Sequence, residues 1–74
     1  MVPVATRCLI PDLAEAKGWS LGELSRRAGI SKATVAAYAR MRTKDMPLKN
    51  AIAIATALGV RPEDLYEWDW RCLF

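Results

Sequence analysis

The 74-residue chain contains no histidine, and this absence removes several kinds of chemistry at once. Histidine is the side chain whose pKa suits proton transfer near neutral pH, and it belongs to Ser-His-Asp and Cys-His catalytic arrangements. It is also a common zinc ligand. The sequence has no Gly-rich phosphate loop, nucleophile elbow or paired-carboxylate constellation either. We therefore predict that the protein is not an enzyme, binds no metal and needs no cofactor.

Cysteine is also scarce, with Cys8 and Cys72 standing 64 positions apart. Two thiols cannot supply the four ligands of a structural zinc site. One disulfide between them stays open, but the N-terminus lacks the basic and apolar segments of a secretory leader, so we favour reduced thiols. The most apolar stretch, residues 51–60, is shorter than the roughly 20 residues that cross a bilayer. We therefore predict a cytoplasmic protein with no membrane partner.

The length allows one domain, residues 1–74, with little room for a cavity. A chain of this size buries only roughly 60–65% of the surface that its unfolded form exposes, so its margin of stability is thin. A large enclosed pocket is not expected, which argues against a small-molecule substrate. A thin core also favours support from a second copy, and we predict a homodimer.

The middle of the chain concentrates positive charge. The whole sequence has eleven basic and eight acidic residues, which give a net charge of +3. Residues 1–23 sum to −1, residues 24–49 to +6 and residues 50–74 to −2. A localised basic segment of this kind is typical of a surface that meets a polyphosphate, although a solvated face is the simpler alternative.

Helical signals follow one another through most of the sequence. Pro11 suits the first turn of a helix that runs to Lys17. Ser20 and Glu23 are spaced as a capping box, in which each side chain accepts a hydrogen bond from the backbone N–H of the other residue. Further helices are predicted over three ranges, followed by a short helix that opens with a proline: 21–28, 32–40, 48–58 and from 62 onward.

Both ends of the chain show the alternation of a β-strand rather than helical spacing. Every second residue along 2–8 and along 68–74 falls on one face of an extended chain. We predict that these two segments pair, either within one chain or across a dimer. Such pairing is expected to bring Cys8 and Cys72 towards each other.

Residues 21–40 meet the constraints of two helices joined by a tight turn. The fifth position must be small where the helices cross, and it is Ser25. The ninth must permit the backbone of the turn, and it is Gly29. The positions that seal both helices against a core are all apolar, namely Leu24, Ile30, Val35 and Tyr38. An ordinary helical hairpin is the simpler alternative, but the neighbouring basic cluster favours a helix-turn-helix motif.

This motif and two later segments resemble a known family. Residues 24–35, 54–60 and 63–65, which read LSRRAGISKATV, IATALGV and EDL, look like the Cro and lambda-repressor-like (Xre-type) helix-turn-helix family. The resemblance covers about residues 9–68 and is closest to small single-domain bacterial and phage members. It implies a mainly α, five-helix fold, to which the ends would add short strands. It also implies a sequence-specific transcriptional regulator, for which we favour a repressor, with double-stranded DNA as its partner.

In that family the second helix of the motif enters the major groove of DNA. The resemblance assigns base reading to the start and the exposed face of the 32–40 helix, at Lys32, Ala33, Thr34 and Ala37. Lysine donates hydrogen bonds to guanine, whereas alanine offers only apolar contact. Phosphate binding is assigned to two helix N-termini and to a basic loop, at Ser20, Ser31, Arg40, Arg42, Thr43 and Lys44.

Two positions depart from the family pattern. Leu21 stands where the family often has a phosphate-binding glutamine, which removes one clamp on the DNA backbone. Met41 stands where the family usually has glycine after the recognition helix, which affects the geometry of the loop.

The aromatic C-terminus supports a different class of function. The last seven residues contain four large apolar side chains, more than a chain of this size exposes without a use: Trp68, Trp70, Leu73 and Phe74. They form a predicted dimer or partner surface. The same residues would serve a protein-interaction module, such as an antitoxin or an adaptor, that keeps the fold but binds a protein. Packing within one chain, over Trp19 and the side of the core next to the last predicted helix, is the third alternative.

Overall fold

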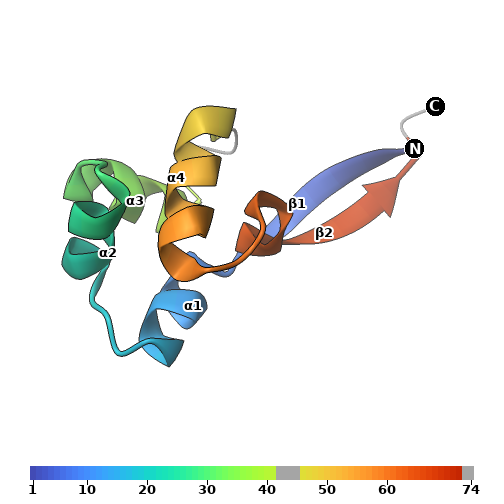
Figure 1. The fold of residues 1–74 in the computed structure, drawn as a ribbon. Coiled ribbons are helices and arrows are strands. Elements are labelled where there is room, and N and C mark those ends of the chain that lie inside the picture. The colour runs from blue at the N-terminus through green and yellow to red at the C-terminus, as the bar shows by residue number, and fades with distance from the viewer. Residues whose placement is uncertain (42–45, 73–74) are drawn as a thin grey trace.

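The chain begins and ends in one two-stranded ribbon, and between the two strands it forms a body of helices (Figure 1). The structure, a computed structural model, describes residues 1–41 and 46–72. The ribbon projects away from the helices and carries the N-terminus at its far end (Figure 1). The molecule is therefore elongated, with principal extents of 41 × 21 × 19 Å.

Four α-helices and one short 3-10 helix occur in the described residues: α1 (Ile10–Ala16), α2 (Leu21–Ala28), α3 (Lys32–Ala39), α4 (Leu48–Leu58) and η1 (Pro62–Leu65). The predicted fifth α-helix is therefore wrong. The η1 segment is only four residues long and passes directly into a strand at Tyr66, so no full α-helical turn forms. The Asp64 carboxylate closes its start by accepting a hydrogen bond from the Arg61 N–H at 3.2 Å.

Serine caps determine where α2 and α3 begin. The Ser20 hydroxyl accepts a hydrogen bond from the Glu23 N–H at 3.1 Å, and the Ser31 hydroxyl accepts one from the Thr34 N–H at 3.2 Å. Both bonds satisfy a backbone donor that a helix start otherwise leaves unpaired. The return half of the predicted capping box is wrong, because the Glu23 carboxylate pairs with two arginines of the following turn instead.

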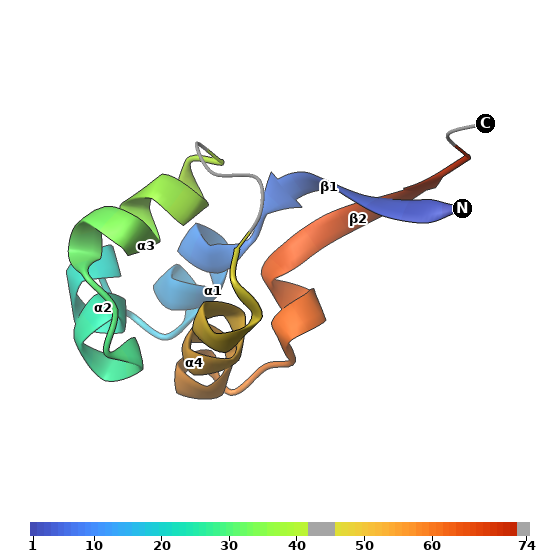
Figure 2. The same ribbon diagram turned by 90° about the horizontal axis from the view of Figure 1, so that it is seen from above.

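The core lies where the α-helices and η1 meet, at the base of the ribbon (Figure 2). Its five largest fully buried side chains come from five different elements: Ile10, Leu24, Val35, Ile54 and Leu65. Tyr38 is also buried, so three of the predicted core positions, with Leu24 and Val35, are confirmed. No helix in the described part of the chain is both long and apolar enough to cross a membrane.

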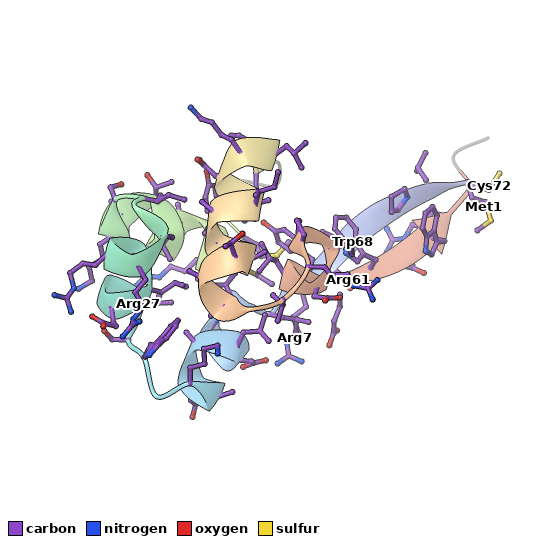
Figure 3. The ribbon with its side chains drawn as sticks, viewed as in Figure 1. Met1, Arg7, Arg27, Arg61, Trp68 and Cys72 are labelled. Carbon is purple, nitrogen blue, oxygen red and sulfur yellow. The ribbon has the colours of Figure 1, made fainter. Side chains whose placement is uncertain are left out.

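The ribbon consists of β1 (Val2–Cys8) and β2 (Tyr66–Arg71), which pair antiparallel within one chain. This confirms one of the two predicted arrangements. Its register puts Cys8 opposite Tyr66 at the base of the ribbon. The predicted approach of Cys8 and Cys72 is wrong, because antiparallel pairing places the end of β1 beside the start of β2. Cys8 is buried at the base, and Cys72 lies at the exposed tip (Figure 3).

Candidate nucleic-acid interface

The turn between α2 and α3 brings the two helices together at a small side chain. Ser25 is only 6% exposed, and its hydroxyl donates a hydrogen bond to the Gly22 carbonyl at 2.7 Å, so the side chain lies against its own helix. Gly29 ends α2 with a left-handed φ of 74°, a conformation that costs glycine little. The Ile30 N–H then returns to the Ser25 carbonyl at 3.1 Å. These residues fix the angle at which α3 leaves the turn.

One face of α3 is fixed against the core. Val35 and Tyr38 are buried, and the Tyr38 hydroxyl accepts a hydrogen bond from the Asn50 amide on α4 at 2.8 Å. This bond joins two helices that are far apart in the sequence. The position of α3 is therefore set from both sides, by the turn and by α4.

The opposite face of α3 is a shallow hollow of about 210 Å³, lined by Ala33, Ala36, Ala37 and Arg40. No side chain larger than alanine stands on it until Arg40, which is exposed at the end of the helix. Sequence reasoning missed Ala36, which was not among the predicted base-reading residues. The signal was weak, since four of the eight residues of α3 are alanine and its periodicity is faint.

The first turn of α3 carries three polar side chains. Lys32 is exposed, and its aliphatic stem lies over the start of α2, where a Cβ added to Gly22 would be 3.7 Å from Lys32 Cδ. The hydroxyls of Ser31 and Thr34 are 2.7 Å apart, so the two side chains share a hydrogen bond in addition to the cap. The Lys32 ammonium group is thus the one full charge at this end of the helix.

The predicted phosphate-binding residues fall into two groups. Ser20 and Ser31 cap the exposed N-termini of α2 and α3, where the helix dipoles favour an anion. Arg40 lies at the other end of α3, beside the alanine-lined hollow. The remaining predicted residues, Arg42, Thr43 and Lys44, lie outside the described residues.

Two further arginines, Arg26 and Arg27 on α2, are held by partners within the chain. Both pair with Glu23, Arg27 at 3.1 Å. The pKa of the Glu23 carboxyl lies below its usual value, mainly because Arg26 donates a hydrogen bond to it. The positive charge of Arg26 and the hydrogen bond and charge of Arg27 lower this pKa further. The Arg27 guanidinium also lies 4.3 Å from the centre of the Trp19 ring (Figure 3). Their charge is therefore partly neutralised, whereas Arg40 forms no ion pair with another described residue.

Met41 shows how the chain leaves α3 without the glycine that the family usually has there. Its φ is +57°, the left-handed conformation that side chains other than glycine adopt at a cost. The side chain is partly buried against the core. Packing of the methionine thus accompanies a backbone conformation that glycine would adopt more easily.

The predicted aromatic surface lies on the ribbon, away from α3. Trp68 and Trp70 are 43% and 61% exposed. The Trp68 indole donates a hydrogen bond to the Glu63 carbonyl at 2.8 Å, and its ring meets Tyr66 edge to face. Trp19 contacts Lys17 and an arginine instead, so the Trp19 part of the predicted packing within one chain is wrong for the described residues. The other part, packing on the side of the last predicted helix, is confirmed for Trp68 by its bond to η1. Leu73 and Phe74 lie outside the described part of the chain.

Comparison with protein families gives one match that spans most of the chain. Residues 10–69 match the Cro/C1-type HTH DNA-binding domain. Among curated proteins, the chain is 42% identical over 62 residues to the SPbeta prophage-derived uncharacterized HTH-type transcriptional regulator YopS of Bacillus subtilis (strain 168). That alignment covers 84% of each protein.

Solved structures share the fold. SinR, the master regulator for biofilm formation, in complex with DNA superposes with a TM-score of 0.72 at 25% identity, over 76% of this chain and 89% of that chain. The chain spans about half, 54%, of the length of the chain matched in the SinR–SinI complex. The restriction-modification controller protein C.AhdI from Aeromonas hydrophila gives a TM-score of 0.70 at 30% identity, over 77% and 85% of the two chains.

Proposed function

The chain belongs to the Cro/C1-type helix-turn-helix family of DNA-binding transcriptional regulators, and on this premise we propose that it binds double-stranded DNA through α3 and represses transcription. The relative with 42% identity is named as a transcriptional regulator, and one structural neighbour was solved with DNA. The family expectation drawn from residues 24–35 is thereby confirmed.

The alanine-lined face of α3 is the observation that carries the proposal. The major groove of B-DNA is roughly 12 Å wide, and a helix with its side chains is about 10–12 Å across. Ala33, Ala36 and Ala37 keep the helix narrow on its exposed face, which favours close approach to base edges. Lys32 at one end supplies a hydrogen-bond donor for guanine, and the alanines suit the methyl group of thymine.

Phosphate contacts would hold α3 in its groove. Arg40 is exposed and lies beside the same face, and its planar guanidinium suits bidentate contact with a phosphate. The capped N-termini at Ser20 and Ser31 offer backbone N–H groups to phosphates of the adjoining strand. Arg42, Thr43 and Lys44 complete the set proposed from the sequence.

A homodimer is part of the proposal. Helix-turn-helix proteins bind operators that consist of two related half-sites. A homodimer with two-fold symmetry presents one recognition helix to each half-site. We propose a binding protein without catalytic activity, which acts on DNA in the cytoplasm. The thin core of a 74-residue chain favours the dimer as well.

Duplex binding by fluorescence anisotropy tests the proposal. Fragments from upstream of the protein's own gene are compared with a scrambled duplex at two salt concentrations. Sequence-dependent binding that weakens with salt is expected, with a slope of about 0.9 per neutralised phosphate. Arg40→Ala should weaken binding to every duplex and lower the salt slope by about 1. Lys32→Ala should instead reduce discrimination between sequences, by about 1–3 kcal/mol at the contacted base pair.

Arg61→Ala is the matched control, because it removes the same charge at a site before η1 and away from α3 (Figure 3). Its affinity for each duplex should stay close to that of the wild type. Equal losses for Arg40→Ala, Lys32→Ala and Arg61→Ala on all sequences would contradict a specific role for α3. Absence of any sequence preference in the wild type would overturn the proposed function itself.

A further inference from the structure

The two faces of β2 differ in polarity. Along β2, Tyr66, Trp68 and Trp70 share one face, because side chains alternate along a strand. Their partners in β1 include Ala5 opposite Trp68 and Pro3 opposite Trp70. This apolar face is buried at its base and becomes exposed towards the tip, where nothing in the described chain covers the two tryptophans fully. The other face carries Glu67, Asp69 and Arg71 of β2, with Val4 opposite Asp69 and Val2 opposite Arg71 on β1.

The two outer edges of the ribbon differ as well. On β1, Pro3 has no N–H to donate, and proline is tolerated in a ladder where its nitrogen faces away from the paired strand. The register also shifts between Ala5 and Arg7. Proline and such irregularities are devices that protect an edge strand from pairing with another chain. The β2 sequence, residues 66–71, has neither device, so its outer edge offers a regular row of backbone donors and acceptors.

We propose that this edge pairs with the same edge of a second copy, so that two ribbons form one antiparallel four-stranded sheet with the β2 strands at its centre. The two-fold axis would pass through Asp69. In this register Trp68 of one copy faces Trp70 of the other, and Glu67 faces Arg71 of the other. Trp70 and Trp68 then meet twice in each dimer, on the apolar face.

Charge complementarity identifies the occupant as a second copy. The order of charges along β2 is acidic at Glu67, acidic at Asp69 and basic at Arg71. When this strand is reversed onto itself about Asp69, each Glu67 meets an Arg71, which opposes unlike charges across the strands. The two Asp69 carboxylates would meet at the axis, where like charges oppose pairing, and the Arg71 of the same chain, at 2.9 Å from each, offsets this repulsion. Each Glu67 also pairs with Arg7 of its own chain at 3.4 Å, so Arg71 of the second copy would be its second basic neighbour. An isologous interface requires this kind of self-complementary pattern.

The exposed aromatic area is a substantial part of what such an interface needs. The exposed fractions of Trp68 and Trp70 amount to about one whole tryptophan side chain in each copy. Across two copies this is roughly 300–500 Å², where a specific interface needs roughly 1,000 Å². The remainder would come from the strand backbones and from the apolar groove between β1, β2 and α4, which is lined by Val4, Leu48 and Ala51 among others.

This inference rests on the proposed function only in that it supplies the homodimer proposed there. Its test contains no DNA, so failure of DNA binding and failure of the interface give different results. Cysteine cross-linking reads the register directly. In a Cys72→Ser background, Asp69→Cys would place two thiols opposite each other, with Cα atoms about 4.5–5.5 Å apart, within the reach of a disulfide.

Val2→Cys in the same background is the matched control, because Val2 lies opposite Arg71 on β1 and its replacement leaves every side chain of β2 in place. The two Val2 positions would lie on the outer strands of the sheet, at least three strand spacings or roughly 14 Å apart, which is beyond the reach of a disulfide. Under mild oxidation, Asp69→Cys should give a covalent dimer and Val2→Cys should stay monomeric on a non-reducing gel. Cross-linking of both variants to the same extent, or of Val2→Cys alone, would overturn the register.

Light scattering of the unmodified chain tests the dimer without any new thiol. Twice the chain mass is expected at high concentration, and Trp70→Glu should weaken association by about tenfold or more. Ile52→Glu, which places the same charge on an exposed apolar site of α4, should associate as the wild type does. Circular dichroism checks that both variants are folded. A wild type that is monomeric at all concentrations would overturn the proposal and leave the ribbon as a surface for a different protein.

Discussion

The helical body and the ribbon differ in how much of their apolar surface is buried. In the body, large side chains such as Leu24 and Ile54 have no exposed surface. In the ribbon, Cys8 is buried at the base, where desolvation raises the pKa of its thiol. Towards the tip, Trp68 and Trp70 remain 43% and 61% exposed. The ribbon thus holds two of the three tryptophans of the chain but buries neither completely.

The difference in burial indicates that the body stabilises the folded monomer and that the tip of the ribbon contacts a partner. A side chain stabilises the folded monomer roughly in proportion to the apolar area that it removes from water. By this measure the body carries most of the stability, and it also holds α3 in place. The tip of the ribbon contributes little to one copy, so its large aromatic side chains are better explained by a partner than by folding.

The largest loss of stability is expected from truncating a side chain at the centre of the body. Leu24→Ala should lower the free energy of unfolding by about 2–5 kcal/mol, because it leaves a cavity between α2 and the rest of the core. A small single domain has little more stability than this to lose. Urea unfolding followed by circular dichroism measures the change.

Trp70→Ala is the counterpart on the ribbon. It removes a larger side chain from an exposed site, and in dilute protein it should lower the free energy of unfolding by less than about 0.5 kcal/mol. A loss for Trp70→Ala equal to that for Leu24→Ala would show that the ribbon is part of the core of one copy.

An effect between these two is expected where the ribbon is attached to the body. The Trp68 indole N–H bonds the Glu63 carbonyl of η1 at 2.8 Å. Trp68→Phe keeps an aromatic ring but loses this bond, which is worth about 0.5–1.5 kcal/mol. Hydrogen exchange should become faster at the amides of β1 and β2, while those of α2 and α4 keep their protection. Equal acceleration in both regions would contradict separate stabilities for ribbon and body.

Most helices of the body could be predicted because their signals are local. Serine caps at Ser20 and Ser31 and the glycine after α2 give boundaries that agree with the structure to within about one residue. Two local predictions were wrong because another interaction competes. Glu23 pairs with the arginines of its own helix rather than with the Ser20 N–H, and the segment after Pro62 gives way to the strand before a full turn forms.

The site could be predicted only in outline, because its details depend on tertiary contacts. The exposure of Lys32 and Arg40 follows from the helical period. The alanines of α3 carry a weaker signal: Ala33 and Ala37 were assigned to the open face through the family resemblance, and the structure adds Ala36 to it. Likewise, the alternation at the two ends predicts strands, but it takes the register to show that Cys8 and Cys72 lie at opposite ends of the ribbon.

The smallest expected effect concerns the ion pairs on the surface of the body. Arg26 lowers the pKa of Glu23 in the folded state through its hydrogen bond and its charge, and Arg27 lowers it further in the same two ways. The ionised carboxylate therefore favours folding at pH values above its unfolded pKa of about 4.3, and this contribution is lost as the pH falls through the lower folded pKa. The difference in unfolding free energy between the wild type and Glu23→Gln should accordingly be greatest above about pH 5 and shrink towards pH 3.

Salt separates this effect from a change in packing. At 1 M NaCl the Debye length is about 3 Å, so exposed ion pairs are screened and the pH-dependent difference between wild type and Glu23→Gln should become smaller. A difference that is independent of both pH and salt would mean that Glu23 acts through its aliphatic part or its helix propensity. The Glu23 pairs would then add nothing to the stability of the body, which would rest on its buried side chains and its serine caps alone.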